Sequence, residues 1–407
     1  MSVRGCKKGN SVSVFVARRV SVSFGARIAV FVLWSLLFLF VPAGVRAQSS
    51  TIQHIAAPGW WPTKTVASPK EYVGPAVCTG CHSDQAPQKN TSMARTLMRA
   101  FDSDLLNKAR FSYDAGPYHF RTAHSLGESQ ILISDGAKTV AETLQWALGA
   151  GKVGQTYLFE KQGSFQEVRV SYFDTLKNFD LTPGDKIPST PHDLDDVLAR
   201  SLLQKEVKRC FGCHASLAEN EKNSMPNVVT PGVTCEVCHG PGAQHVAENE
   251  IEQDVSQELN DTAIFDPAHL KPADAVDFCG SCHGTWFDVA SKHISGLLNL
   301  RMQPYRLENS LCWLSFDSGD RRLTCTACHN PHEPVVRDSI AYDKKCLSCH
   351  LSATGSQPTP DHPGVACKVE TTDCVSCHMP KLESPGMYTK FTDHQIRIVH
   401  EGEPYPN

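Results

Sequence analysis

Seven copies of the pentapeptide Cys-x-x-Cys-His constrain this chain of 407 residues more than any other feature. Two thiols three positions apart can add to the two vinyl groups on one edge of a porphyrin, and the adjacent imidazole can then bind the iron. With 17 Cys and 18 His in the chain, chance would supply only ~0.03 such copies. The repeat therefore predicts seven covalently bound haem c groups.

Each motif predicts two attachment cysteines and one proximal iron ligand. The attachment cysteines are Cys78, Cys81, Cys210, Cys213, Cys235, Cys238, Cys279, Cys282, Cys325, Cys328, Cys346, Cys349, Cys374 and Cys377. The proximal ligands are His82, His214, His239, His283, His329, His350 and His378. We number the motifs 1 to 7 in this order.

Disulfide frameworks and zinc sites also use paired cysteines. A disulfide framework has no need of a histidine after every second cysteine, and structural zinc sites usually place their histidines in a separate element. The motifs leave Cys6, Cys312 and Cys367 over. Cys6 lies in the predicted signal peptide, and Cys312 and Cys367 either pair in an oxidising compartment, which we favour, or remain free.

The N-terminus predicts export. A cationic lead that includes Arg18, Arg19 and Arg27 precedes an apolar run over 28–41 and the sequence Val45-Arg46-Ala47. This is the layout of a secretory signal peptide over 1–47, and the apolar run is shorter than the ~20 residues of a membrane span. We therefore expect a periplasmic protein whose mature chain has no membrane span, with an extracellular location left open.

Charge bears on the partners. The full chain has 39 Lys and Arg against 43 Asp and Glu, a net charge of −4, and residues 1–47 hold seven of the Lys and Arg and no acid, so the rest carries −11. An acidic protein is a poor partner for nucleic acid. We expect redox proteins as donor and acceptor, and leave the oligomeric state open.

The spacing of the motifs predicts the organisation. About 130 residues separate the first motif from the second, whereas the later ones follow at intervals of about 20 to 45. We expect an N-terminal segment with the first haem over 48–104, a β-rich insertion over 105–191, a six-haem domain over 192–382, and a C-terminal tail over 383–407 that folds back on the haems. The fold class expected is mainly α with much irregular structure around the cofactors, α+β overall.

Runs of β-forming residues predict a small antiparallel sheet near 105–185 that covers the first haem. Its clearest hairpin joins 155–160 to 165–173 through the turn Lys161-Gln162-Gly163-Ser164. Apolar residues at helical spacing over 192–209 predict an amphipathic helix that leads into motif 2.

The second axial ligand of each iron decides whether it only passes electrons or can bind a substrate. His245 and His332 follow motifs 3 and 5 so closely that each would ligate a neighbouring haem rather than its own. His394 is a further candidate in the tail, with Asp393 as a local hydrogen-bonding group. Met93 could be a thioether ligand of the first haem or a buried methionine on a helix.

Several stretches resemble a known superfamily: Ser92-Met93-Ala94-Arg95, GVTCEVCHGPGAQHV, LTCTACHNPHEP and CVSCHMPK with FTDH. They are similar to the tetrahaem electron acceptor of hydroxylamine oxidoreductase and to the related pentahaem nitrite reductases and octahaem oxidoreductases. The resemblance covers most of 71–396. It implies packed haem pairs with two histidine ligands, His245 and His332 among them, and periplasmic electron transfer.

Two departures matter for function. The pentahaem nitrite reductases carry a catalytic haem whose motif ends in lysine, and all seven motifs here end in histidine. The octahaem enzymes that oxidise hydroxylamine have an eighth motif and a tyrosine cross-linked to the catalytic haem. We therefore favour an electron carrier with no catalytic residue. The alternatives are an oxidoreductase acting on a small nitrogen or sulfur compound at one five-coordinate haem, and a subunit of an extracellular haem wire.

Overall fold

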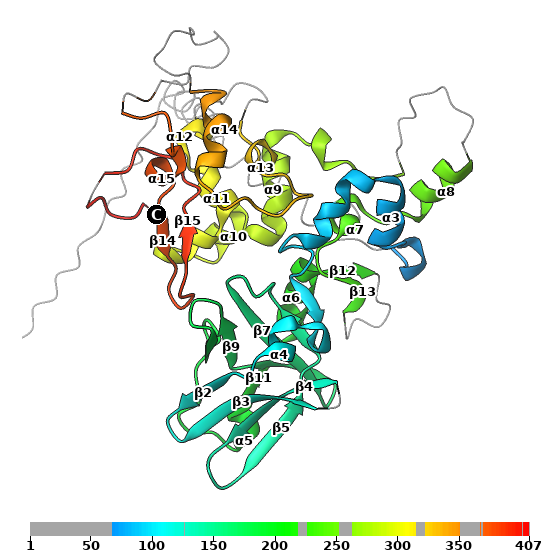
Figure 1. Ribbon diagram of the computed structural model, residues 1–407, viewed down its shortest axis with the longest axis vertical. Helices are drawn as coiled ribbons and strands as arrows, with labels where there is room; N and C mark the ends of the chain where they lie inside the picture. Colours follow the sequence, from blue (N-terminus) through cyan, green and yellow to red (C-terminus); the bar gives the residue numbers. More distant parts are fainter. Residues whose placement is uncertain are drawn as a thin grey trace, which may run out of the picture. The chain divides into compact units, whose positions relative to one another are not determined.

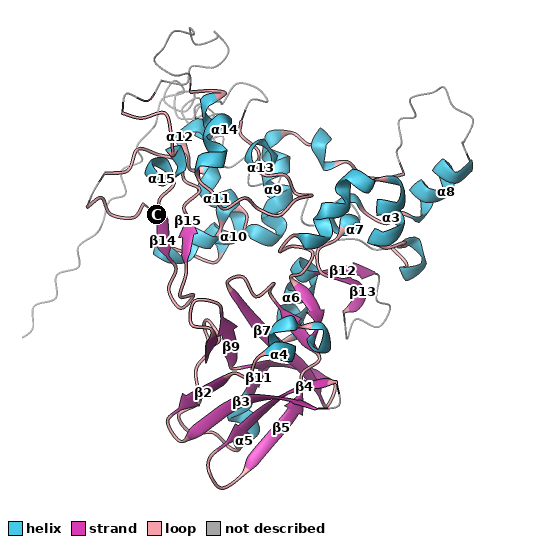
Figure 2. Ribbon diagram, in the orientation of Figure 1, coloured by secondary structure: helices cyan, strands magenta, loops and turns pink. Residues whose placement is uncertain are grey.

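The computed structural model describes residues 67–125, 127–218, 226–251, 263–314, 322–350, 367, 369–400 and 402–406. All of them belong to one compact unit, Gln48–Asn407. The predicted signal peptide lies outside the described residues, as do His54 and His362, two histidines that belong to none of the motifs. Figures 1 and 2 show most of the strands gathered in one group of this unit and most of the helices in another.

Two antiparallel sheets dominate the strand group. The larger has seven strands: β1 (Leu97–Arg99), β6 (Trp146–Leu148), β7 (Gly154–Lys161), β8 (Ser164–Val168), β9 (Val170–Phe173), β10 (Asn178–Leu181) and β11 (Ala199–Ser201). The smaller has four: β2 (Ser112–Ala115), β3 (Tyr118–Ser125), β4 (Glu128–Ser134) and β5 (Thr139–Thr143). The strands thus begin and end outside the predicted 105–185, and the protein is mixed α+β with a larger β part than the sequence suggested.

The two sheets share one apolar core. In β4 every second side chain is buried, as expected for a strand with one face in the core, and Ile131 and Ile133 are fully buried. They belong to the same cluster as Tyr157 and Phe159 of β7 and Val197 of the short helix α5 (Leu194–Leu198).

The hairpin predicted around Gly163 is confirmed. Strands β7 and β8 pair in register from Leu158 opposite Glu167 to Lys161 opposite Ser164. Gln162 and Gly163 both have positive φ, of 53° and 76°, which is the backbone of the two-residue turns that suit twisted hairpins.

The prediction of one continuous helix over 192–209 is wrong for the middle of that range. Strand β11 interrupts it, and helix α6 (Gln204–His214) begins only after that strand. Ala199 pairs with Val168 and Ser201 with Gln166, so the chain extends to complete the edge of the larger sheet. Strand pairing across the chain outweighs the local helical pattern.

The remaining elements are short, and six of the helices among them carry motif residues. The α-helices are α3 (Pro75–Cys81), α4 (Asp104–Lys108), α7 (Cys235–His239), α8 (Ala243–Ile251), α9 (Pro272–His283), α10 (Trp286–Ser291), α11 (Gln303–Glu308), α12 (Leu311–Leu314), α13 (Cys325–Cys328), α14 (Asp343–Leu347) and α15 (Cys374–His378). The 3₁₀ helices are η2 (Pro69–Glu71), η3 (Ser83–Asn90), η4 (Ala100–Asp102), η5 (Pro267–His269), η6 (Gly296–Arg301) and η7 (Ile340–Tyr342). There are also two two-stranded antiparallel sheets. One pairs β12 (Ala215–Ala218) with β13 (Asn227–Pro231), and the other pairs β14 (Lys381–Glu383) with β15 (Lys390–Thr392).

Side chains of the larger sheet pack against α6, the helix of motif 2. Phe211 of α6 lies with its ring centre 5.5 Å from that of Trp146 and 5.2 Å from that of Phe165. The observed packing is therefore with the second motif, and cover of the first haem by the sheet stays a prediction. The reason is that α6 follows β11 directly and carries Phe211 into the apolar cluster of the sheet.

The motif-rich region contains little apolar core of its own. In the described part of the chain beyond residue 270, the apolar cluster consists of the buried Val276, Leu307 and Trp313. Val335, Val336 and Ile340 are 50% to 64% exposed. None of the helices in the described ranges is long and apolar enough to cross a membrane.

Gly232, in the loop before motif 3, provides a first prediction. Its φ is +82°, and a Cβ there would lie 1.9 Å from the carbonyl oxygen of Ala94, in the segment after motif 1. We expect Gly232→Ala to lower the free energy of unfolding by about 3 kcal/mol, from backbone strain and the clash together. Urea denaturation followed by circular dichroism measures this.

The control for Gly232 is Gly116→Ala. Gly116 has a φ of +62°, and a Cβ there would meet no atom within 4 Å. Only the backbone strain remains, at about 1 kcal/mol. Equal losses in the two variants would show that the approach of Gly232 to Ala94 contributes nothing.

Candidate functional site

Each motif forms one helical turn, which in motifs 2 and 4 is the last turn of the longer helices α6 and α9. The amide of the histidine donates to the carbonyl of the first cysteine, at 2.9 Å in His82, His329 and His350. A helical turn places side chains three positions apart on one face, so both thiols of a motif point the same way. The histidine follows at the end of this turn.

Three motif histidines face a second imidazole from elsewhere in the chain. Ring centres are 6.1 Å apart for His82 and His245, with an interplanar angle of 21°. They are 6.1 Å apart at 13° for His239 and His332. For His329 and His394 the values are 6.3 Å and 43°.

These separations fit a metal ion between the rings. An iron bound by two imidazoles needs about 6 Å between ring centres, because each metal–nitrogen bond is about 2 Å and each nitrogen lies about 1 Å from its ring centre. The residues thus fit the group that the motifs imply.

Backbone carbonyls orient four of the histidines. The Nδ1–H groups of His214, His239 and His378 donate to the carbonyls of Thr96, Phe265 and Arg397, each at 2.9 Å. His394 donates in the same way to Thr392, at 3.0 Å. A carbonyl only accepts, so the proton is held on Nδ1 and the lone pair of Nε2 is left for a metal.

Burial keeps the imidazoles neutral. It lowers the pKa of His214, His283, His329 and His332, and it lowers that of His394 to about 4. Desolvation disfavours the charged ring in each of them. A neutral imidazole is the form that binds metal.

Thiols from different motifs are close enough to shift one another's pKa. The thiol of Cys235 raises the pKa of Cys78, which brings motif 3 beside motif 1. Similar thiol pairs join motif 2 to motif 4, motif 4 to motif 5, and motif 6 to motif 7; they are Cys213 with Cys282, Cys279 with Cys325, and Cys346 with Cys374.

Weaker effects of one thiol on the pKa of another connect the remaining motifs. Besides burial, the Cys279 thiol raises the pKa of Cys238, and the Cys349 thiol raises that of Cys328. Motif 3 therefore lies near motif 4, and motif 5 near motif 6. In space the motifs follow the order 1, 3, 4, 5, 6, 7, with motif 2 joined at motif 4.

Glu236 of motif 3 holds motif 1 in place. Its carboxylate is 3% exposed and accepts from the backbone amides of Val73 and Gly74, both at 2.9 Å, and of Gly242 at 3.0 Å. Val73 and Gly74 come directly before α3, and Gly242 precedes α8, which carries His245. One side chain therefore joins both halves of the pair His82 and His245.

A cavity of ≈ 450 Å³ adjoins motif 5. Cys328, His329, Pro331 and Tyr342 are among the residues that line it. It lies against the thiol and the imidazole that the motif supplies, and its volume is within the range of sites for small molecules and cofactors.

Other predicted candidates lie elsewhere. Met93 is half-buried, and its carbonyl accepts from the amides of Thr96 and Val233. Among the described residues, no ring contact joins a second imidazole to His214, His283 or His378, although His214 is near enough to His283 to lower its pKa.

Cys312 and Cys367 are both free thiols, so the disulfide favoured from the sequence is not formed in the structure. Cys312 lies half-buried in α12, whereas Cys367 is exposed.

Sequence patterns did not indicate Glu236, because its role depends on backbone amides from distant segments. Asp393 was expected to bond locally in the tail. It does so, to the amide of Gln395 and the side chain of Arg397, but it is also fully buried in an ion pair with Arg306 of α11.

Comparison with known proteins adds a partial match. Residues 191–240, which hold motifs 2 and 3, match the family model described as cytochrome c554 and c-prime. This segment resembles a c-type cytochrome.

Among curated proteins, none matches the chain significantly. A crystal structure described as the outer cell wall cytochrome OcwA aligns with a TM-score of 0.44 and 17% identity, over 81% of this chain and 80% of that one.

Proposed function

We propose that this chain is an exported seven-haem c-type cytochrome that relays single electrons between redox proteins. The observation that carries the proposal is the set of three facing imidazole pairs at 6.1 to 6.3 Å, each built on a Cys-x-x-Cys-His motif. The cytochrome c554 match of residues 191–240 supports it independently.

Each motif supplies two thiols for covalent attachment and one proximal imidazole. His245, His332 and His394 supply the second ligand at motifs 1, 3 and 5. Bound haem supplies an iron that takes up and gives back one electron without a change of covalent structure. The chain fixes the imidazoles through backbone carbonyls and buries them, so that ligation changes little when the oxidation state changes.

The neighbouring thiols support a relay. Since consecutive motifs in the order 1, 3, 4, 5, 6, 7 share close cysteines, no motif in the series stands apart from the next. Motif 5 joins the first part of the series to motifs 6 and 7, and motif 2 forms a branch. An electron that enters at either end can pass through the whole series.

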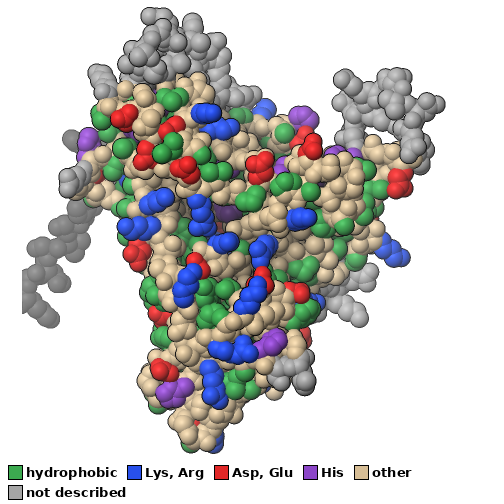
Figure 3. Space-filling model, in the orientation of Figure 1, with side chains coloured by type: hydrophobic (Ala, Val, Ile, Leu, Met, Phe, Trp, Pro, Cys, Tyr) green, Lys and Arg blue, Asp and Glu red, His purple; other side chains and the backbone are tan. Residues whose placement is uncertain are grey.

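The partners are redox proteins outside the cytoplasmic membrane, in the periplasm. The predicted net charge of −11 beyond residue 47 favours partners with basic patches. Lys and Arg side chains nevertheless gather across the middle of the face in Figure 3. We propose that the donor and the acceptor dock on surfaces of different charge.

A second candidate is an oxidoreductase with one open iron. It is favoured by His214, His283 and His378, which have no ring contact with a second imidazole within the described ranges. One of these irons could bind a small nitrogen or sulfur compound directly.

Mass spectrometry and low-temperature electron paramagnetic resonance test both candidates on the oxidised protein. We expect a mass with seven haems attached and a spectrum in which all irons are low-spin. A high-spin signal of about one iron per chain would favour the oxidoreductase, and fewer haems than motifs would contradict the proposal.

A further inference from the structure

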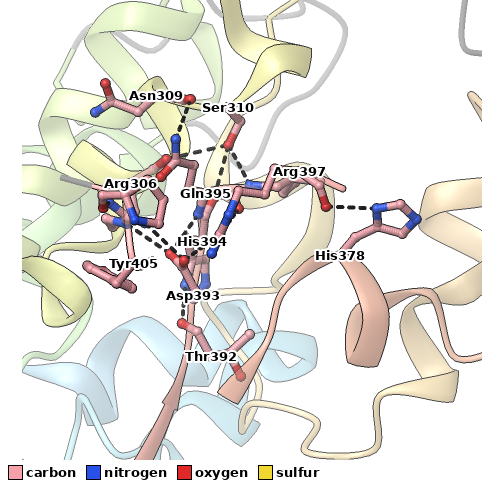
Figure 4. A network of polar contacts seen from close by, with 12 residues as sticks. Arg306, Asn309, Ser310, His378, Thr392, Asp393, His394, Gln395, Arg397 and Tyr405 are labelled. Atoms are coloured by element: carbon pink, nitrogen blue, oxygen red, sulfur yellow. Dashed lines mark hydrogen bonds and ion pairs between the residues drawn. The ribbon is translucent and has the colours of Figure 1, made fainter. Parts of the chain in front are cut away.

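A buried ionic cluster lies between two motif ligands (Figure 4). Arg306 and Asp393 have side chains that are 0% exposed and form a two-pronged ion pair: Nε to Oδ1 at 2.9 Å and Nη2 to Oδ2 at 2.9 Å. Arg397 adds a second guanidinium, with its Nη1 at 2.6 Å from Oδ2 of Asp393. We name these three residues the Asp393 cluster.

Arg306, the member of the cluster that lies in α11, also contacts Tyr405 and Pro406. Its Nη1 donates to the carbonyl of Pro406 at 2.8 Å, and its guanidinium lies 4.5 Å from the ring centre of Tyr405. This arginine therefore holds two separate parts of the C-terminal tail against one helix.

Ser310, two residues beyond the end of α11, holds the tail on both sides of His394. Its hydroxyl donates to the carbonyl of His394 at 3.1 Å and accepts from the amide of Ile396 at 2.8 Å. Asp393 accepts from the amide of Gln395 at 3.0 Å. The backbone on both sides of His394 is thus fixed to Ser310 or to the cluster.

The cluster reaches two haem motifs. Asp393 directly precedes His394, whose ring faces His329 of motif 5. Arg397, which binds Asp393 through its side chain, accepts the Nδ1–H of His378 of motif 7 on its carbonyl oxygen at 2.9 Å. One carboxylate is therefore linked to a ligand at motif 5 and to a ligand at motif 7.

A buried ion pair is weak evidence of a stabilising role, because apolar side chains of the same volume often do as well. A fork of two parallel hydrogen bonds does, however, fix the relative orientation of its partners. Removing one partner leaves a buried charge without compensation, so the segment must move.

We propose that Arg306 and Asp393 are positioning residues that set the His394 ring against His329 and the orientation of His378 at the same time. The inference rests on the proposed function, since it takes His394 and His378 to be iron ligands. It predicts that one substitution in the cluster alters two haems of the seven and leaves the others unchanged.

The test uses the full holoprotein with four variants: Asp393→Asn, Arg306→Met, Arg306→Lys and His394→Ala. The readouts are haem content by mass and electron paramagnetic resonance of the oxidised protein. For Asp393→Asn and Arg306→Met we expect one new high-spin iron per chain, which added imidazole returns to low spin, and shifted signals of one further low-spin iron. Arg306→Lys keeps the charge but not the fork, and we expect an intermediate high-spin fraction.

A matched control is Arg169→Met. Arg169 forms a similar ion pair with Asp185, at 2.6 Å and with side chains 12% and 6% exposed, beside the larger sheet. The Arg169→Met substitution removes a mostly buried guanidinium of the same kind, at a position that is distant in the sequence from the ligands of the tail. We expect lower stability and an unchanged spectrum.

The outcomes separate the inference from the proposed function. His394→Ala without a new high-spin iron would overturn the ligand assignment, and with it the proposed function at motif 5. A high-spin iron in His394→Ala together with wild-type spectra for Asp393→Asn and Arg306→Met would overturn the positioning role alone. The same spectral change in Arg169→Met would also overturn it. If Asp393→Asn and Arg306→Met do not retain seven haems, the test rests on Arg306→Lys. A wild-type spectrum of that variant would overturn the positioning role.

Discussion

Replacing Glu236 with alanine is expected to lower the free energy of unfolding by about 3 to 4 kcal/mol, because three backbone amides lose a charged acceptor in a buried position. These amides belong to Val73, Gly74 and Gly242, at 2.9 to 3.0 Å from the carboxylate. The loss should fall on the junction of motifs 1 and 3, so the ligation of His82 should weaken with it. Urea denaturation followed by circular dichroism measures the first effect, and electron paramagnetic resonance the second.

Glu206→Ala is the control for this experiment. Glu206 also accepts from a backbone amide, that of Leu203 at 2.8 Å, and binds Arg200 at 2.9 Å, but its side chain is 32% exposed. Water can replace those contacts, so we expect a loss of about 1 kcal/mol. Similar losses in the two glutamate variants would contradict the joining role of Glu236.

Replacing His245 with alanine is expected to convert one iron per chain from low spin to high spin. In the proposed arrangement His245 is the second ligand at motif 1, and its removal leaves an open position at the iron bound by His82. The measurement is spin quantification of the oxidised protein against its haem content. Added imidazole should restore the low-spin signal.

Two further variants make this result decisive. His119 lies exposed on β3, with its Nδ1 at 2.7 Å from Oδ1 of Asp114, so His119→Ala should leave all spectra unchanged. Met93→Ala tests the other candidate for the first haem. A high-spin iron in Met93→Ala and none in His245→Ala would transfer the ligand role to the methionine.

Local features of this protein could be predicted well from the sequence. A Cys-x-x-Cys-His motif acts within one helical turn, so its chemistry is contained in five consecutive residues. The hairpin at Gly163 is also local, because its turn needs positive φ at adjacent positions. His332 and His245 were expected to pair with neighbouring motifs, and their rings face His239 and His82.

Contacts between distant segments were not predictable in the same way. The pattern over 192–209 favours a helix, and residues 199–201 form a strand because the edge of β8 offers them backbone partners. Asp393 bonds nearby to Gln395 and Arg397, as expected, but its two-pronged ion pair with Arg306 of α11 had no signal in the sequence. Many segments could pair with the edge of β8, and many side chains could bind Asp393. Their distance along the sequence does not show which of them does.

The sequence by itself therefore determined where thiols and proximal imidazoles stand, because covalent attachment to a porphyrin requires a fixed local spacing. Only the tertiary structure decided which imidazole faces which motif, that Glu236 joins motif 1 to motif 3, and that the sheet packs on motif 2. Those choices depend on burial and on hydrogen bonds between segments far apart in the chain, whose free energies are set by the packed fold as a whole.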